Sequence, residues 1–120
     1  MKLNSFRMKY LVASAGYDCK VDYDGDKVDY GIFDLFNGNR EGSIPMPQEL
    51  EKGILEVFDK YDVAARPFDT SEKEGFDLPS LDVVFVVDGH TYGFRGNPGV
   101  FDIVNSVVSD LLELVDKYLV

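Results

Sequence analysis

A repeat within the chain constrains its fold more than any other feature. Residues 112–120 read LELVDKYLV and residues 55–63 read LEVFDKYDV, and six of these nine positions are identical. Shorter matches continue upstream in the same order: Asp24-Gly25 with Asp88-Gly89, Tyr30-Gly31 with Tyr92-Gly93, Gly38-Asn39 with Gly96-Asn97, and Gly42 with Gly99. The simplest explanation is one hairpin-then-helix unit that is used twice, over residues 18–63 and 81–120.

The first copy contains an Asp-Gly pair that is typical of a two-residue hairpin loop, because glycine accepts a positive φ and aspartate tolerates it. With Asp24-Gly25 as this loop, Val21 is expected to face Val28 across the two strands. The other face of the hairpin would then carry two pairs of opposite charge, Asp22 with Lys27 and Lys20 with Asp29. Such pairs stabilise a hairpin by about 0.2–1 kcal/mol each.

The second copy follows the same rule with Asp88-Gly89 as its loop, so that Phe85 is expected to face Tyr92. Val84 and Val86 lie on the opposite face of this hairpin, where the first copy carries charges. A strand with apolar side chains on both faces is typical of a sheet that other parts of the protein cover on both faces. Some further part of the protein, or a second subunit, is therefore expected to cover these valines.

Each hairpin is followed by a segment with helical periodicity. Residues 47–61 place their apolar side chains on one stripe, and Pro47 suits the first helical position. The final helix is expected to begin near Pro98 or Gly99, with Asn97 as a candidate cap. Its apolar residues cover more than half of its circumference, and its narrow polar stripe consists of Asp102, Ser106, Ser109, Glu113, Asp116 and Lys117. This helix is expected to be deeply buried or to contact a second subunit.

The N-terminal segment fits two structures. Its residues 6–10 alternate like a strand, whereas Leu3, Phe6, Tyr10, Ala13 and Tyr17 have helical spacing, and Gly16 just past the end favours the helix. Residues 63–80 are predicted to form a loop, with a short strand near residues 63–68 as an option. The fold class is therefore predicted to be α+β, in the order α-ββ-α-ββ-α. The two hairpins would form one antiparallel sheet with the helices mainly on one face, within a single domain of 120 residues.

The charge balance restricts the partners of this chain. It has 22 acidic residues against 12 basic ones, a net charge of −10, and such a surface repels nucleic acid and anionic membranes but permits a basic protein partner. No apolar run approaches the roughly 20 residues of a membrane span, and charges interrupt the first nine residues, so we expect a cytoplasmic protein. Cys19 is the only cysteine, which excludes an intramolecular disulfide.

Candidate catalytic and metal-binding motifs are weak. The acidic run at residues 22–29 lacks the glycine and the glutamate that a calcium-binding EF-hand loop requires at its sixth and twelfth positions. His90, the only histidine, has no nucleophile with an orienting carboxylate beside it in the expected fold. Residues 95–99 could hold an anion on free backbone N–H groups but lack the lysine of a phosphate-binding loop. The carboxylates have no spacing signature that would favour or exclude a hydrolase. We expect no metal and no cofactor.

Three classes of function fit these observations. The composition favours a small acidic, non-catalytic binding protein of the inhibitor, immunity or anti-defence type, which occupies a basic site on a larger partner. The second class is a dimeric chaperone-like module, similar in element order to small acidic secretion chaperones although no motif matches. The third is a domain that binds a small ligand or acts as an enzyme through its strand-to-helix loops.

We also expect a homodimer, because a monomer would expose apolar patches on both the final helix and the second hairpin. The candidate interface residues are Val84, Val86, Val108, Leu112, Asp102 and Glu113.

Overall fold

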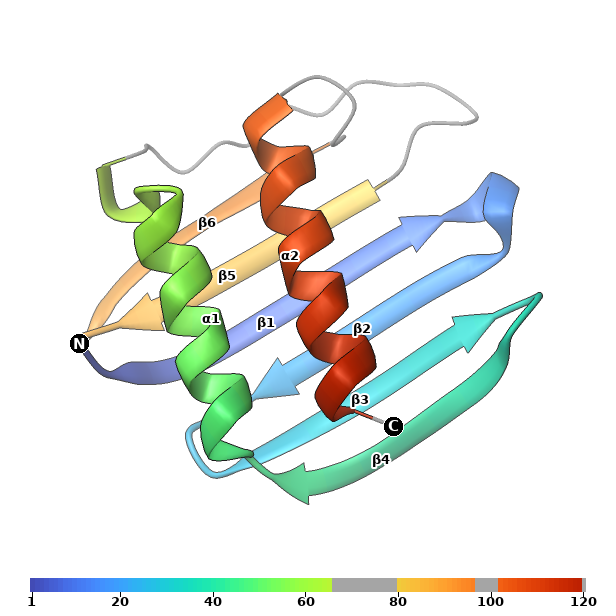
Figure 1. Ribbon diagram of the computed structural model, residues 1–120, viewed down its shortest axis with the longest axis horizontal. Coiled ribbons are helices and arrows are strands. Elements are labelled where there is room, and N and C mark those ends of the chain that lie inside the picture. The colour runs from blue at the N-terminus through green and yellow to red at the C-terminus, as the bar shows by residue number, and fades with distance from the viewer. Residues whose placement is uncertain (66–79, 97–101, 120) are drawn as a thin grey trace.

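A computed structural model describes residues 1–65, 80–96 and 102–119 of this chain (Figure 1). Within these ranges it contains, in chain order, β1 (Leu3–Val12), β2 (Tyr17–Tyr23), β3 (Lys27–Asp34), β4 (Gly38–Pro45), α1 (Gln48–Lys60), β5 (Ser80–Val87), β6 (His90–Gly96) and α2 (Asp102–Tyr118). The strands form one antiparallel sheet in the order β4-β3-β2-β1-β5-β6. The α+β fold class is thus confirmed. Both described helices lie on the same face of the sheet.

The N-terminal segment is a central strand, so the helix expected there is wrong. β1 lies between β2 and β5 and pairs with both over most of its length. Phe6 and Met8 point into the core, at 2% and 0% exposure, while Arg7 and Lys9 point to the other face. Gly16, which suggested a helix end, instead closes a single 3₁₀ turn between β1 and β2 with a φ of 61°. The alternation of residues 6–10 was therefore the correct signal.

The first hairpin has a longer loop than expected, and the predicted register is wrong. Tyr23 pairs with Val28, and Val21 pairs with Tyr30 rather than with Val28. The Asp24 carboxylate accepts hydrogen bonds from the backbone N–H groups of Asp26 and Lys27, at 2.9 and 3.0 Å, and thereby stabilises a loop over residues 24–26.

A shift of two residues keeps every side chain on its face, so the apolar face of the first hairpin is as expected. The predicted ion pairs are lost, however. Asp22 now faces Asp29, and Lys20 faces Gly31.

The second hairpin agrees with its predicted register. Phe85 pairs with Tyr92 and Val86 with Thr91. Asp88 and Gly89 both have positive φ values, 51° and 80°, as a two-residue loop of this type requires. The loop is also bonded to the N-terminal segment, because the Asp88 N–H donates to the Lys2 carbonyl and the Asp88 carboxylate accepts a hydrogen bond from the Lys2 N–H.

The edge strand β4 was not expected. It lies between the first hairpin and α1, which spans Gln48–Lys60 within the predicted range. After the second hairpin, residues 97–101 lie outside the described residues, and so do the predicted start and cap of the final helix. Val63–Ala65 forms a 3₁₀ turn rather than part of a strand, and residues 66–79 are likewise outside the described ranges.

The core lies between the sheet and the two helices. Phe85 of β5 is fully buried, with its ring 5.2 Å from that of Phe6 and 5.5 Å from that of Phe58 on α1. The helices approach each other closely at Gly53, where a Cβ atom would lie 2.6 Å from a methyl carbon of Leu114. The buried residues of α2 are Val104, Val107, Val108, Leu111 and Val115.

Candidate functional site

Neither of the two described helices covers the second face of the sheet, which we call the open face. Side chains alternate between the two faces along each strand, so the charged side chains that point away from the core lie on the open face. Five are basic and five are acidic: Arg7, Lys9, Lys20, Lys27 and Arg95, and Asp18, Asp22, Asp29, Glu41 and Asp82. The open face is therefore neutral, although the chain as a whole has a net charge of −10.

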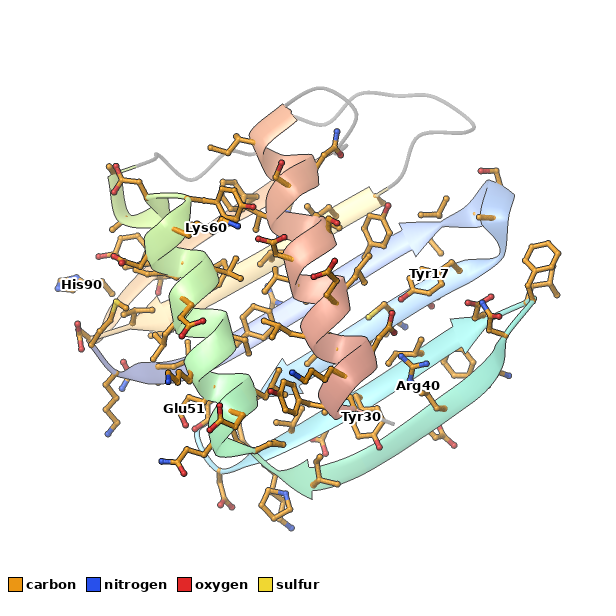
Figure 2. The ribbon with its side chains drawn as sticks, viewed as in Figure 1. Tyr17, Tyr30, Arg40, Glu51, Lys60 and His90 are labelled. Atoms are coloured by element: carbon orange, nitrogen blue, oxygen red, sulfur yellow. The ribbon has the colours of Figure 1, made fainter. Side chains whose placement is uncertain are left out.

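The exposed surface of α1 and α2, which we call the helical face, is acidic. It carries exposed carboxylates that form no ion pair among the described residues: Glu49, Glu56, Asp59 and Glu113. The exposed lysines on these helices are Lys52, Lys60 and Lys117. Lys60 forms an ion pair with Asp110. Arg40 of β4 lies beside the C-terminal end of α2 and pairs with Asp116 (Figure 2). An excess of free carboxylates therefore faces solvent on this side.

Asp110 links the two helices. The Tyr61 hydroxyl donates a hydrogen bond to its carboxylate at 2.7 Å, and the Lys60 ammonium donates another at 3.1 Å. These contacts, the tyrosine bond foremost, lower the pKa of Asp110 below its ordinary value. A lowered folded-state pKa contributes stability above the unfolded-state pKa of about 3.9, and this stability is lost as the pH falls through the folded-state pKa.

Replacing Tyr61 with phenylalanine is therefore expected to lower the free energy of unfolding by about 1 kcal/mol at pH 7, because it removes a hydrogen bond to a charged group. At pH 2, where the Asp110 carboxyl approaches its neutral form, the difference between Tyr61→Phe and the unmodified protein should shrink. Urea unfolding of both proteins at the two pH values measures it. An equal difference at pH 7 and pH 2 would contradict the role of the ionised carboxylate.

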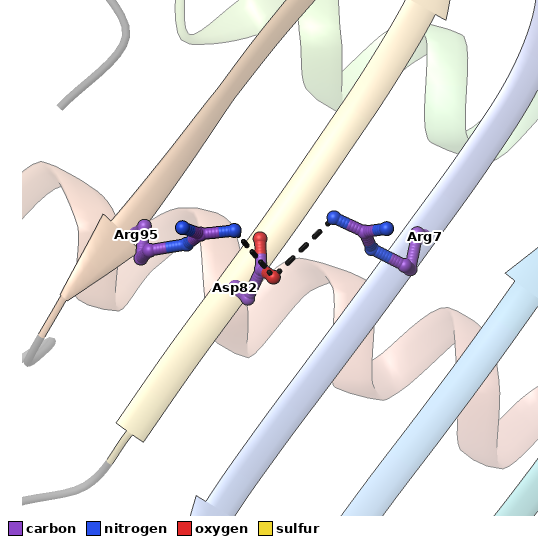
Figure 3. A network of polar contacts seen from close by, with 3 residues as sticks. All are labelled: Arg7, Asp82 and Arg95. Atoms are coloured by element: carbon purple, nitrogen blue, oxygen red, sulfur yellow. Dashed lines mark hydrogen bonds and ion pairs between the residues drawn. The ribbon is translucent and has the colours of Figure 1, made fainter. Parts of the chain in front are cut away.

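Three residues form a charged network on the open face (Figure 3). Asp82 of β5 lies between Arg7 of β1 and Arg95 of β6, and its Oδ2 atom is 3.4 Å from an Nη2 atom of each arginine. The Asp82 side chain is 19% exposed, so the three charges are partly shielded from solvent. The Nε atom of Arg7 and the Oδ1 atom of Asp82 are buried without a hydrogen-bond partner in the part of the chain that the structure describes.

The charges on the open face are also separated across the sheet. The half formed by β1, β5 and β6 has three bases and one acid: Arg7, Lys9, Arg95 and Asp82. The half formed by β2, β3 and β4 has two bases and four acids: Lys20, Lys27, Asp18, Asp22, Asp29 and Glu41. The β1-β5-β6 half thus has a net positive charge, and the β2-β3-β4 half has a net negative charge of the same size. Where the halves meet, Lys9 directly faces Lys20, a like-charge pair that destabilises a sheet.

Exposed apolar residues gather at one end of the sheet. Leu35 and Phe36, in the turn between β3 and β4, are 76% and 80% exposed, and Leu11 and Phe33 are about half exposed. The turn itself is well bonded, because the Asp34 carboxylate accepts hydrogen bonds from the N–H groups of residues 36 and 37. Two apolar side chains on one turn are too few for a stable interface of ordinary size.

The six candidate interface residues lie on different surfaces. Val84 and Val86 are half-buried on the open face, and Glu113 is exposed on the helical face. Leu112 is half-buried, and Val108 is only 3% exposed because it packs in the core. The side chain of Asp102 lies outside the described part of the structure.

Sequence reasoning did not find the Arg7–Asp82–Arg95 network, since Arg7 was assigned to a helix. Its only sequence signal was the predicted register of the second hairpin, because a pairing of Phe85 with Tyr92 also places Asp82 opposite Arg95.

Within the part of the chain that the structure describes, His90 and Cys19 lie far apart in the sheet. His90 is exposed at the start of β6, on the outer edge of the molecule (Figure 2). Cys19 is buried in β2, and β1 and β5 separate this strand from β6, which carries His90. Burial raises the pKa of the Cys19 thiol to about 11. Among the described residues, no three His, Cys, Asp or Glu side chains are grouped to hold a metal ion.

No known protein family, curated protein or solved structure matches this chain. In the described ranges, none of the helices has the length and apolar character to cross a membrane.

Proposed function

We propose that this protein is a non-catalytic protein-binding module of the inhibitor or immunity type, which occupies a basic site on a larger partner. The observation that supports this proposal is the unequal distribution of charge. On the helical face the carboxylates outnumber the basic side chains, whereas on the open face the two kinds are equal in number. An acidic surface attracts a basic partner over a distance and raises the rate of association.

The groove between the helices is the centre of the proposed contact surface. It is lined by Glu56, Val57 and Lys60 of α1 and by Glu113 and Leu114 of α2, among others. Gly53 allows the helices to approach each other here. Half-buried Leu114 provides an apolar contact between carboxylates, and such a mixture is typical of a protein interface with a charged rim.

Neutralising Glu56, Asp59 and Glu113 together, as Glu56→Gln, Asp59→Asn and Glu113→Gln, is expected to weaken binding of the partner at least tenfold at low salt. The partner would first be recovered from the native host at low ionic strength and then titrated by calorimetry. For the unmodified protein, affinity should fall steeply with salt, because exposed charges are screened beyond about 8 Å at physiological ionic strength. The triple variant should show a shallower dependence.

A matched control removes three acids from the open face instead, as Asp22→Asn, Asp29→Asn and Glu41→Gln. Both triple variants change the net charge by the same amount, so a difference between them reports the position of the charges. Binding is counted per subunit, which makes the result independent of oligomeric state. An equal loss of affinity in both variants, or an affinity that does not change with salt, would contradict the proposal.

A further inference from the structure

We infer that the open face is the interface of a homodimer, in which the basic half of one copy lies against the acidic half of the other. The partner is thus a second copy of this chain. The inference concerns the face opposite to the one proposed above for the basic partner, so either proposal can fail without the other.

Symmetry limits which surface of this protein can pair with itself. A two-fold dimer uses the same patch on both subunits, so the patch must be complementary to its own copy. The helical face carries free carboxylates and would meet an equally acidic copy, which costs free energy. The open face is neutral and has one positive and one negative half, so it can match a rotated copy of itself.

The charge pattern also selects the direction of the two-fold axis. An axis that runs along the strands, near the boundary between β1 and β2, places the β1-β5-β6 half of one sheet over the β2-β3-β4 half of the other. Arg7 then faces Asp22 of the second copy and Arg95 faces Glu41, whereas Lys9 faces Lys20. An axis across the strands would place each half over its own equivalent and oppose like charges.

The open face has the size and the bonding capacity for such an interface. Six strands spaced by about 4.8 Å, each rising about 3.3 Å per residue, give a footprint on the order of 700 Å². Stable interfaces use about 800 Å² per partner. Half-buried Val84 and Val86 supply apolar contact. Arg7 and Arg95 each donate one hydrogen bond to Asp82, which leaves further guanidinium donors for carboxylates of the second copy.

A charge-swap experiment tests this pairing on the full chain. The first variant carries Arg7→Glu, Lys9→Glu and Arg95→Glu, and the second carries Asp22→Lys, Asp29→Lys and Glu41→Lys. We expect the unmodified protein to be a dimer at high micromolar concentration in sedimentation equilibrium. Each variant alone opposes like charges and should dissociate, with a dimer Kd at least a hundredfold higher. An equimolar mixture of the two variants should form a heterodimer, because both pairs of facing halves become complementary again.

A control variant carries Glu56→Lys, Asp59→Lys and Glu113→Lys on the helical face. It changes the net charge as much as the second variant does and should stay dimeric. The inference is overturned if the unmodified protein is a monomer, if the second variant stays a dimer, or if two folded variants do not associate when mixed. Should the first variant fail to fold by circular dichroism, the unmodified protein and the second variant decide the matter, since Asp22, Asp29 and Glu41 are exposed and form no ion pair among the described residues.

Discussion

Replacing Phe85 with alanine is expected to lower the free energy of unfolding by about 3–5 kcal/mol, because it removes the largest contacts at the centre of the core and leaves a cavity. Phe85 is 0% exposed and its ring contacts those of Phe6 on β1 and Phe58 on α1. The substitution therefore loosens the central strands and the helical layer at once. Since small domains are stable by only about 5–15 kcal/mol, a large part of the stability would be lost.

Chemical denaturation of Phe85→Ala and of the unmodified protein measures this difference. Phe36→Ala is the matched control, because the same side chain is removed from a position that is 80% exposed. It should change the free energy of unfolding by no more than about 0.5 kcal/mol. Similar losses for the two variants would contradict the placement of Phe85 in the core.

Replacing Met8 with asparagine is expected to cost about 3–5 kcal/mol. Met8 is 0% exposed on the core side of β1. Asparagine would lose its apolar contacts and bury an amide without hydrogen-bond partners. The next residue, Lys9, points to the open face, so Lys9→Asn should change stability by no more than about 0.5 kcal/mol.

The comparison of positions 8 and 9 tests whether the N-terminal segment is a central strand. Both variants introduce the same residue, so the intrinsic strand preference of asparagine cancels between them. Thermal unfolding followed by circular dichroism would show a large decrease in the transition temperature for Met8→Asn only. Equal effects at these neighbouring positions would show that β1 does not bury alternate residues.

The elements that could be predicted from the sequence depend on interactions within a short stretch of chain. Asp88-Gly89 forms a two-residue loop because both residues accept positive φ values, and α1 follows from the helical spacing of its apolar residues. The first hairpin shows the limit of this reasoning. Its Asp24-Gly25 pair has the same local signal, but the Asp24 side chain bonds two backbone N–H groups and favours a longer loop.

The candidate site was less predictable than the fold. Val84 and Val86 were correctly placed away from the core face of the second hairpin, since strand alternation is a local property. Val108 was named as a candidate interface residue although it packs in the core, because periodicity alone does not tell how far a sheet covers a helix. The division of the charges into an acidic helical face and a neutral open face depends on which strands are neighbours, and this follows only from the complete sheet order.

Patterns within short stretches of chain were sufficient to predict the α+β class, the second hairpin and the first amphipathic helix, and composition gave the acidic balance. They did not show that residues 3–12 form a central strand, which depends on the arrangement of the whole sheet. The two neighbours of this strand are β2, which follows directly, and β5, which lies about 75 residues further along the chain. A strand derives most of its stability from the neighbours that it pairs with and packs against. Its position therefore depends on distant residues that no local pattern describes.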